Sequence, residues 1–102
     1  MEPTRETLYQ DEVVHFLCDY LWDIQKVSLH LNITPGAWSV GKFKKYYSIF
    51  INKIVPFLKA RNYNEVYATP LENDIKAQKL IKMFGLYQYG QNMGLVLMKK
   101  EI

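Results

Sequence analysis

The sequence contains two histidines and a single cysteine, and these side chains limit the chemistry that the chain can perform. His30 stands in a segment of alternating apolar and polar residues, and an imidazole is the side chain most often used as a general base. We therefore consider His30 a candidate base, against the simpler interpretation of a polar residue on the less buried face of a strand. His15 and Asp19 form a second, weaker candidate pair. The lone Cys18 excludes an internal disulfide and a cysteine-based zinc site, and we expect it to be a small buried hydrophobic residue.

The segments around His30 indicate how it is positioned. Residues 26–33 (KVSLHLNI) alternate at period two, which predicts a strand with one buried face. The sequence TPG at 34–36 ends this strand, because proline has no amide hydrogen to donate. Apolar residues then recur every three or four positions over residues 39–60, which predicts an amphipathic helix with Ser39 as its N-cap. Pro56 falls in the last turns and is expected to kink or fray that helix.

The rest of the chain supplies further strands and a second helix. Residues 1–11 are expected to be a flexible arm or an edge strand, and residues 12–24 fit either a helix or a strand. A short strand is expected at residues 65–69. Asn73 is a suitable N-cap for a second amphipathic helix, which Gly85 ends, and residues 86–100 indicate a hairpin.

The order of these elements predicts a fold class and a place to look for a ligand. We expect one domain over residues 1–102 of the α/β (α+β) class, a mixed sheet with two main amphipathic helices packed on it. The strand, helix, strand crossover requires its two strands to be parallel or nearly so. The loop at 34–41 leaves the first of these strands, where open α/β sheets bind ligands.

Composition and charge exclude several classes of protein. A chain of 102 residues with 49% hydrophobic and 23% charged residues is one globular domain rather than a disordered chain or a multidomain enzyme. A net charge of +3 is mildly basic, so a nucleic-acid-binding module is the least favoured class. The apolar runs are short and the first ten residues carry no hydrophobic stretch. The sequence therefore predicts no signal peptide, no membrane span and a cytoplasmic protein.

Two parts of the chain carry a family pattern. The first is the strand SLHLNITP followed by the turn GAWSVGK and a helix. The second is the spacing of Asn73, Ala77, Ile81, Gly85 and Leu86. On these motifs the chain resembles, over residues 12–100, the GCN5-related N-acetyltransferase (GNAT) family, and especially its short phage-encoded members. The resemblance implies a truncated form of the family's fold, without its usual N-terminal strand and first two helices.

The resemblance also implies a function and a set of residues. The function is transfer of an acetyl group from acetyl-CoA to an amine, with His30 as the base. The residues that would bind the cofactor are Ile33, Gly36, Ser39, Val40, Gly41, Lys42 and Asn73. Only Gly41 survives of the glycines in the family's phosphate turn, where Ser39 and Phe43 take the other two places. Ile81 stands where the family has a tyrosine that protonates the leaving thiolate, which makes Tyr87, or else Tyr67 or Tyr89, the candidate acid.

These departures leave a second interpretation open. The chain is then a non-catalytic structural protein that keeps the acetyltransferase fold as a scaffold, associated with a phage particle or virion, and its partners are other protein subunits rather than an amine substrate. An exposed sheet edge favours a homodimer or a larger assembly in either case. A phage-encoded protein would be found in the host cytoplasm or in the virion.

Overall fold

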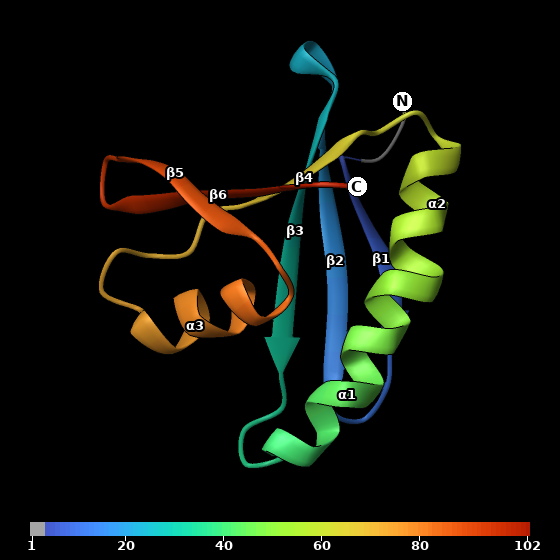
Figure 1. Cartoon of the computed structure of the whole chain (residues 1–102), viewed down its shortest axis with the longest axis vertical. Helices are drawn as coiled ribbons and strands as arrows, with labels where there is room; N and C mark the ends of the chain where they lie inside the picture. Colours follow the sequence, from blue (N-terminus) through green and yellow to red (C-terminus); the bar gives the residue numbers. More distant parts are fainter. Residues whose placement is uncertain (1–3) are drawn as a thin grey trace.

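The computed structural model describes residues 4–102, without the side chain of Val40, and has a mixed sheet of six strands in the order β1-β2-β3-β4-β6-β5. Figure 1 shows the long helix beside β1 and β2, and the shorter helix α3 near the hairpin of β5 and β6. The elements are β1 (Arg5–Gln10), β2 (Val14–Leu21), β3 (Lys26–Ile33), α1 (Val40–Ile49), α2 (Val55–Ala60), β4 (Glu65–Ala68), α3 (Ile75–Met83), β5 (Tyr87–Asn92) and β6 (Leu95–Glu101). The expected fold class is confirmed.

The first three strands form an antiparallel meander. The segment that fitted either a helix or a strand is β2, because every second side chain from Val14 through Phe16 and Cys18 to Tyr20 is buried against the helices. β1 is an edge strand, one of the two expected alternatives for the N-terminal segment, and residues 1–3 lie outside the described residues. β3 has the expected bounds. These strands place polar side chains of β1, β2 and β3 together on the opposite face of the sheet.

The long helix is continuous from Val40 to Ala60, but its middle is a π-helical turn at Phe50–Ile54. The kink expected at Pro56 is therefore replaced by a wider turn just before the proline, where Val55 N–H donates to Phe50 O, five residues back. Pro56 follows closely after this π-helical turn, and its missing N–H leaves one hydrogen bond of the continuous helix unmade. None of the helices within residues 4–102 is long and apolar enough to cross a lipid bilayer.

The crossover from β3 through the long helix leads to β4, which is parallel to β3 as expected. Only one residue pair joins these two strands in the described chain, Ser28 with Tyr67. In Figure 1 the hairpin of β5 and β6 is steeply inclined to β3. The hairpin turns at Met93 and Gly94, which both have positive φ (51° and 79°), as a tight two-residue hairpin turn requires.

Both helical units pack on the same face of the sheet, around Phe84. Its ring lies 5.8 Å from that of Phe16 on β2, 5.2 Å from that of Phe43 on α1 and 5.4 Å from that of Phe50. The core on this face also contains Tyr46 and other large side chains of the long helix. The other face of the sheet is covered by no helix of the described chain.

Candidate functional site

The parallel strands β3 and β4 diverge beyond the pair of Ser28 and Tyr67, and an apolar pocket of about 90 Å³ lies between their ends. Helix α3 closes it on one side. The pocket is lined by Phe16, Leu29, His30, Leu31, Phe50, Ala68, Ala77, Leu80, Ile81, Phe84 and Leu86. All these residues except His30 are apolar, and the side chain of His30 points to the opposite face of the sheet, so the pocket suits an aliphatic or thioester chain and not a charged group.

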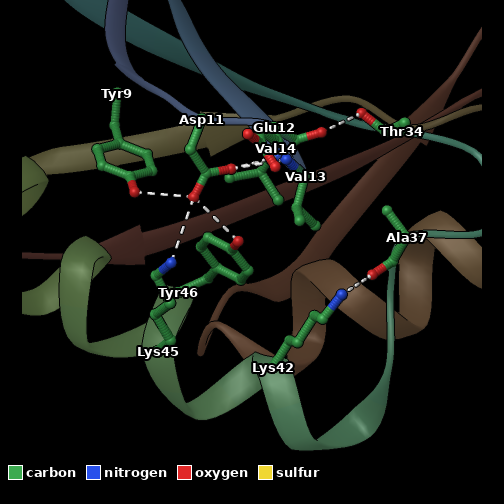
Figure 2. A network of polar contacts seen from close by, with 10 residues as sticks. All are labelled: Tyr9, Asp11, Glu12, Val13, Val14, Thr34, Ala37, Lys42, Lys45 and Tyr46. Atoms are coloured by element: carbon green, nitrogen blue, oxygen red, sulfur yellow. Dashed lines mark hydrogen bonds and ion pairs between the residues drawn. The ribbon is translucent and has the colours of Figure 1, made fainter.

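The turn that follows β3 is fixed to the loop between β1 and β2. Thr34 N–H donates to Val13 O at 2.8 Å, and Thr34 Oγ1 donates to Glu12 O at 2.8 Å, as Figure 2 shows for the side chain. Ala37 N–H closes the turn by donating to Thr34 O at 3.0 Å. Gly36 has a φ of 76°, a left-handed conformation that favours glycine. The path of the chain into α1 is therefore rigidly defined.

The N-terminus of α1 is open at Gly41 but partly occupied elsewhere. Lys42 N–H donates to Ser39 O, and Lys42 Nζ donates to Ala37 O. Gly41 N–H makes no hydrogen bond with any described residue, and a Cβ built on Gly41 would meet nothing within 4 Å. Because a helix N-terminus carries partial positive charge and free amides, this end of α1 can receive an anion.

Trp38 does not fill this turn. Its ring stacks on Tyr46 with centroids 5.6 Å apart and meets the edge of Phe43 at 6.4 Å. The indole is half-buried against α1. The largest side chain of the turn therefore supports the helix and leaves Gly41 accessible.

A carboxylate that sequence reasoning missed orients α1 on the sheet. Figure 2 shows Asp11, in the loop between β1 and β2, facing α1. Asp11 accepts hydrogen bonds from Val13 N (2.8 Å), Val14 N (2.9 Å), Tyr9 Oη (2.8 Å) and Tyr46 Oη (3.0 Å), and lies 3.5 Å from Lys45 Nζ. The bond from Val14 N–H is the main reason that the pKa of Asp11 lies well below its usual range. Burial and the bond to Asp11 raise the pKa of Tyr46 to about 12, so its phenol remains a donor.

His30 lies on the helix-free face of the sheet and pairs with Asp19. His30 Nε2 is 2.7 Å from Asp19 Oδ2, and Asp19 also accepts two hydrogen bonds from Arg5, at 2.7 and 2.9 Å. The bonds from Arg5 are the main reason that the pKa of Asp19 lies below its usual range. The expected pairing of His15 with Asp19 is wrong, because His15 Nε2 instead lies 2.8 Å from Thr7 Oγ1.

The expected site residues Asn73, before α3, and Tyr87, on β5, do not line the pocket. Asp74, not Asn73, is the N-cap of α3, and its carboxylate accepts from Ala77 N–H at 3.1 Å. Asn73 is exposed in the preceding turn and does not line the pocket. Tyr87 lies on the edge strand β5 and donates to Glu101 at 2.7 Å, which raises its pKa. Of the expected site residues, His30 is therefore at the pocket, whereas Asn73, Tyr87 and the turn from Ile33 to Lys42 are not among its lining residues.

Comparisons with known proteins identify the fold. No protein-family model matches the sequence, and no curated protein matches it. The GNAT domain of S. lividans PAT has a TM-score of 0.71 and 13% identity, over 88% of this chain and 54% of that chain. A domain from Methanocaldococcus jannaschii DSM 2661 has a TM-score of 0.67 and 15% identity, over 99% of this chain and 69% of that one.

A third solved structure was determined with ligands. It is the spermidine N-acetyltransferase from Vibrio cholerae in complex with CoA and spermine, with a TM-score of 0.60 and 13% identity over 91% of this chain and 59% of that chain. The chain therefore has the fold of the GNAT acetyltransferases. It spans little more than half the length of the S. lividans domain.

Proposed function

We propose that the protein is an N-acyltransferase that transfers an acetyl group from acetyl-CoA to an amine. The observation that carries this proposal is the divergence of the parallel strands β3 and β4, with an apolar pocket between them and the open N-terminus of α1 at the end of β3. A fold neighbour, the spermidine N-acetyltransferase from Vibrio cholerae, was solved with CoA and spermine, which supports CoA as the cofactor and an amine as the acceptor.

In this proposal the two ends of the site hold different parts of the cofactor. The pyrophosphate lies at the turn formed by Gly36, Ser39, Val40, Gly41 and Lys42, where the helix dipole and the Lys42 ammonium favour negative charge. The pantetheine chain follows β3 past Ile33 into the pocket, whose lining matches an aliphatic chain. The thioester then lies between β3 and β4, beside His30.

The proposed reaction is a direct attack by the amine on the thioester carbonyl. The C–N bond forms and the C–S bond breaks, and the electron pair of that bond leaves with the CoA thiolate. His30 accepts the proton that the amine nitrogen loses. The apolar lining, including Ile81, offers the thiolate no hydroxyl donor, so we assign its protonation to solvent water and give Tyr87 no part in it.

A non-catalytic scaffold that packs against other protein subunits is the second candidate. It is favoured by the turn itself, because the amides of Ala37 and Lys42 are already bonded within the chain. It is also favoured by Ile81, which cannot donate a proton to a leaving thiolate. A scaffold of this kind predicts no affinity for acetyl-CoA.

A calorimetric titration with acetyl-CoA separates the two candidates. We expect wild-type protein to bind one equivalent with an affinity in the micromolar to millimolar range. The substitution Ala77→Leu places a larger side chain in the pocket, so it should weaken binding at least about tenfold, equivalent to about 1.4 kcal/mol. Ala60→Leu is the matched control, because Ala60 is exposed at the end of α2, and should bind as wild type does.

Two results would contradict the proposed binding of acetyl-CoA in the pocket. An absence of heat and of any thermal stabilisation at millimolar acetyl-CoA would leave the scaffold as the remaining candidate. Equal affinities for the Ala77 and Ala60 variants would show that the cofactor binds outside the pocket. Circular dichroism of both variants tests whether either substitution has disturbed the fold.

A further inference from the structure

We propose that Asp19, held in place by Arg5, is a positioning residue that fixes the ring of His30 with its hydrogen on Nε2, so that Nδ1 is the atom that takes the proton from the amine. This inference rests on the proposed acetyl transfer and adds to it a tautomer, a basic atom and two residues that do not touch the substrate. It follows from the side-chain contacts on the helix-free face of the sheet.

One hydrogen lies between His30 Nε2 and Asp19 Oδ2. The two bonds from the Arg5 guanidinium stabilise the ionised form of Asp19, whose pKa is lowered. An ionised carboxylate has no hydrogen to donate, so it can only accept. At a separation of 2.7 Å, Nε2 must therefore be the donor. In the neutral ring this leaves a lone pair on Nδ1.

The Nδ1 side of the His30 ring faces away from Asp19. The side chain of His30 is 38% exposed, and Nδ1 makes no hydrogen bond with the part of the chain that the structure describes. An amine that approaches from solvent can therefore reach this nitrogen. Among residues 4–102, the hydrogen bond that orients the ring comes from Asp19.

The ring of His30 and the pocket lie on opposite faces of the sheet. Leu29 and Leu31 line the pocket, and His30 lies between them on β3, so its side chain points to the opposite face of the sheet. The contact with Asp19 agrees with this, because the neighbours of Asp19 on β2, Cys18 and Tyr20, are buried on the helix face. An acyl group placed in the gap between β3 and β4 would have the pocket on one side and the imidazole on the other.

The proton balance is complete with these groups. The attacking amine nitrogen forms the C–N bond and loses one proton to Nδ1, while the C–S bond breaks and its electron pair leaves on the CoA sulfur. The Nε2–H of the resulting imidazolium still donates to Asp19, whose negative charge stabilises the new positive charge. The ring then returns the proton to solvent. No oxidant, reductant or metal ion takes part.

The simpler alternative is that these three side chains only tie β1, β2 and β3 together. In that case their contacts contribute to stability and still fix the tautomer of His30, but the rate of acyl transfer does not depend on Asp19. The two interpretations therefore differ in whether acetyl-CoA shifts the ring signals of His30 and in whether Asp19→Asn lowers kcat while leaving KM unchanged.

Nitrogen NMR of the full chain with labelled histidine reads the tautomer directly. We expect the neutral ring of His30 to carry its hydrogen on Nε2 in wild-type protein. In Asp19→Asn the preference should be lost, because an amide can either donate or accept. The variant His15→Asn identifies the two sets of ring signals and is the matched control, since His15 faces Thr7 and not Asp19. A wild-type His30 with its hydrogen on Nδ1 would overturn the proposal.

Two further readouts test the link to catalysis. Saturation with acetyl-CoA should shift the ring signals of His30 and leave those of His15 in place. With acetyl-CoA and spermine as the substrates, His30→Gln should lower kcat by about 10² or more. Asp19→Asn should lower kcat at least about tenfold with the KM for acetyl-CoA within about twofold. Arg5→Gln, which keeps the carboxylate but loosens it, should give a smaller loss in kcat.

The outcomes separate this inference from the proposed function. If calorimetry shows no binding of acetyl-CoA, the proposed function fails and the catalytic role of His30 fails with it. If acetyl-CoA binds but the ring signals of His30 do not move, or if Asp19→Asn turns over as fast as wild type, the proposed function stands and the positioning role is refuted. If spermine is not acetylated, the response of the His30 ring signals to acetyl-CoA still decides between the two interpretations.

Discussion

Gly36, in the turn before α1, and Gly41, in the first turn of α1, should change stability in opposite directions when each is replaced by alanine. Gly36 has a φ of 76°, so Gly36→Ala forces a methyl group into the left-handed region at a cost of about 1–2 kcal/mol. Gly41 is helical and has open space around its missing Cβ, so Gly41→Ala should stabilise the protein by about 0.5 kcal/mol. For a domain of this size 1 kcal/mol corresponds to about 4–8 °C in Tm.

A third variant, Gly41→Asp, separates stability from binding. A carboxylate in the first turn of a helix is favourable by about 0.3–1 kcal/mol, which offsets the lower helix propensity of Asp relative to Ala of up to about 0.7 kcal/mol, so this variant should be about as stable as Gly41→Ala. A bound pyrophosphate at about 5 Å would instead be repelled by about 3 kcal/mol per pair of unit charges at an effective dielectric constant of about 20. After screening by salt we expect the affinity for acetyl-CoA to fall at least about tenfold.

Urea denaturation and calorimetric titration measure the two quantities on the same samples. The account requires a destabilised Gly36→Ala, a stabilised Gly41→Ala and a stable Gly41→Asp that has lost affinity. If Gly41→Asp binds acetyl-CoA as tightly as Gly41→Ala does, the N-terminus of α1 is not the phosphate site and the reasoning is refuted.

Three further predictions concern the pocket, the loop before β2 and the core. Ile81→Tyr should raise kcat by up to about 10²-fold, because the phenol supplies a proton donor for the thiolate. An unchanged kcat in an assay of CoA release would show that protonation of the thiolate does not limit the rate. The carboxyl of Asp11 has its pKa lowered chiefly by Val14 N–H, so its contribution to stability is present above about pH 4 and declines as the pH falls towards the folded-state pKa. Asp11→Asn should therefore be less stable at neutral pH and lose less stability in acid, and parallel urea midpoints of both proteins across pH would contradict this. Cys18 is 0% exposed and burial raises its pKa, so a thiol reagent should modify it only after unfolding, and rapid labelling of the folded protein would contradict its burial.

The elements with a single strong period could be predicted from the sequence. Residues 26–33 alternate cleanly between apolar and polar side chains, and β3 has these bounds. The long helix could be predicted because its apolar residues recur every three or four positions. Its π-helical turn could not, because a local change from i−4 to i−5 hydrogen bonds does not alter that spacing. Residues 12–24 were ambiguous because Val13, Leu17 and Leu21, which lie between the residues that face the helices, are apolar too, and this masks the alternation of β2.

The site was only partly predictable, because its contacts depend on which residues of neighbouring strands face each other and on the residue at which each helix begins. Asp74 rather than Asn73 caps α3, and two adjacent residues that are both good caps cannot be separated by composition. The pairing of His30 with Asp19 arises because Asp19 lies opposite Ser28, which puts His30 on the neighbouring diagonal, and no sequence spacing reveals this. Asp11 could have been noticed as a turn residue directly before a strand, but its contact with Tyr46 joins segments far apart in the chain.

Amide NMR of the protein during a titration with acetyl-CoA tests the central claim most directly, because it reports both binding and its location. We predict that the signals of His30, Leu31 and Gly41 shift together and saturate at one equivalent, while those of Met93 and Gly94 at the tip of the hairpin remain in place. The account is contradicted if the signals of His30, Leu31 and Gly41 do not move up to millimolar acetyl-CoA, or if the largest shifts occur at the hairpin.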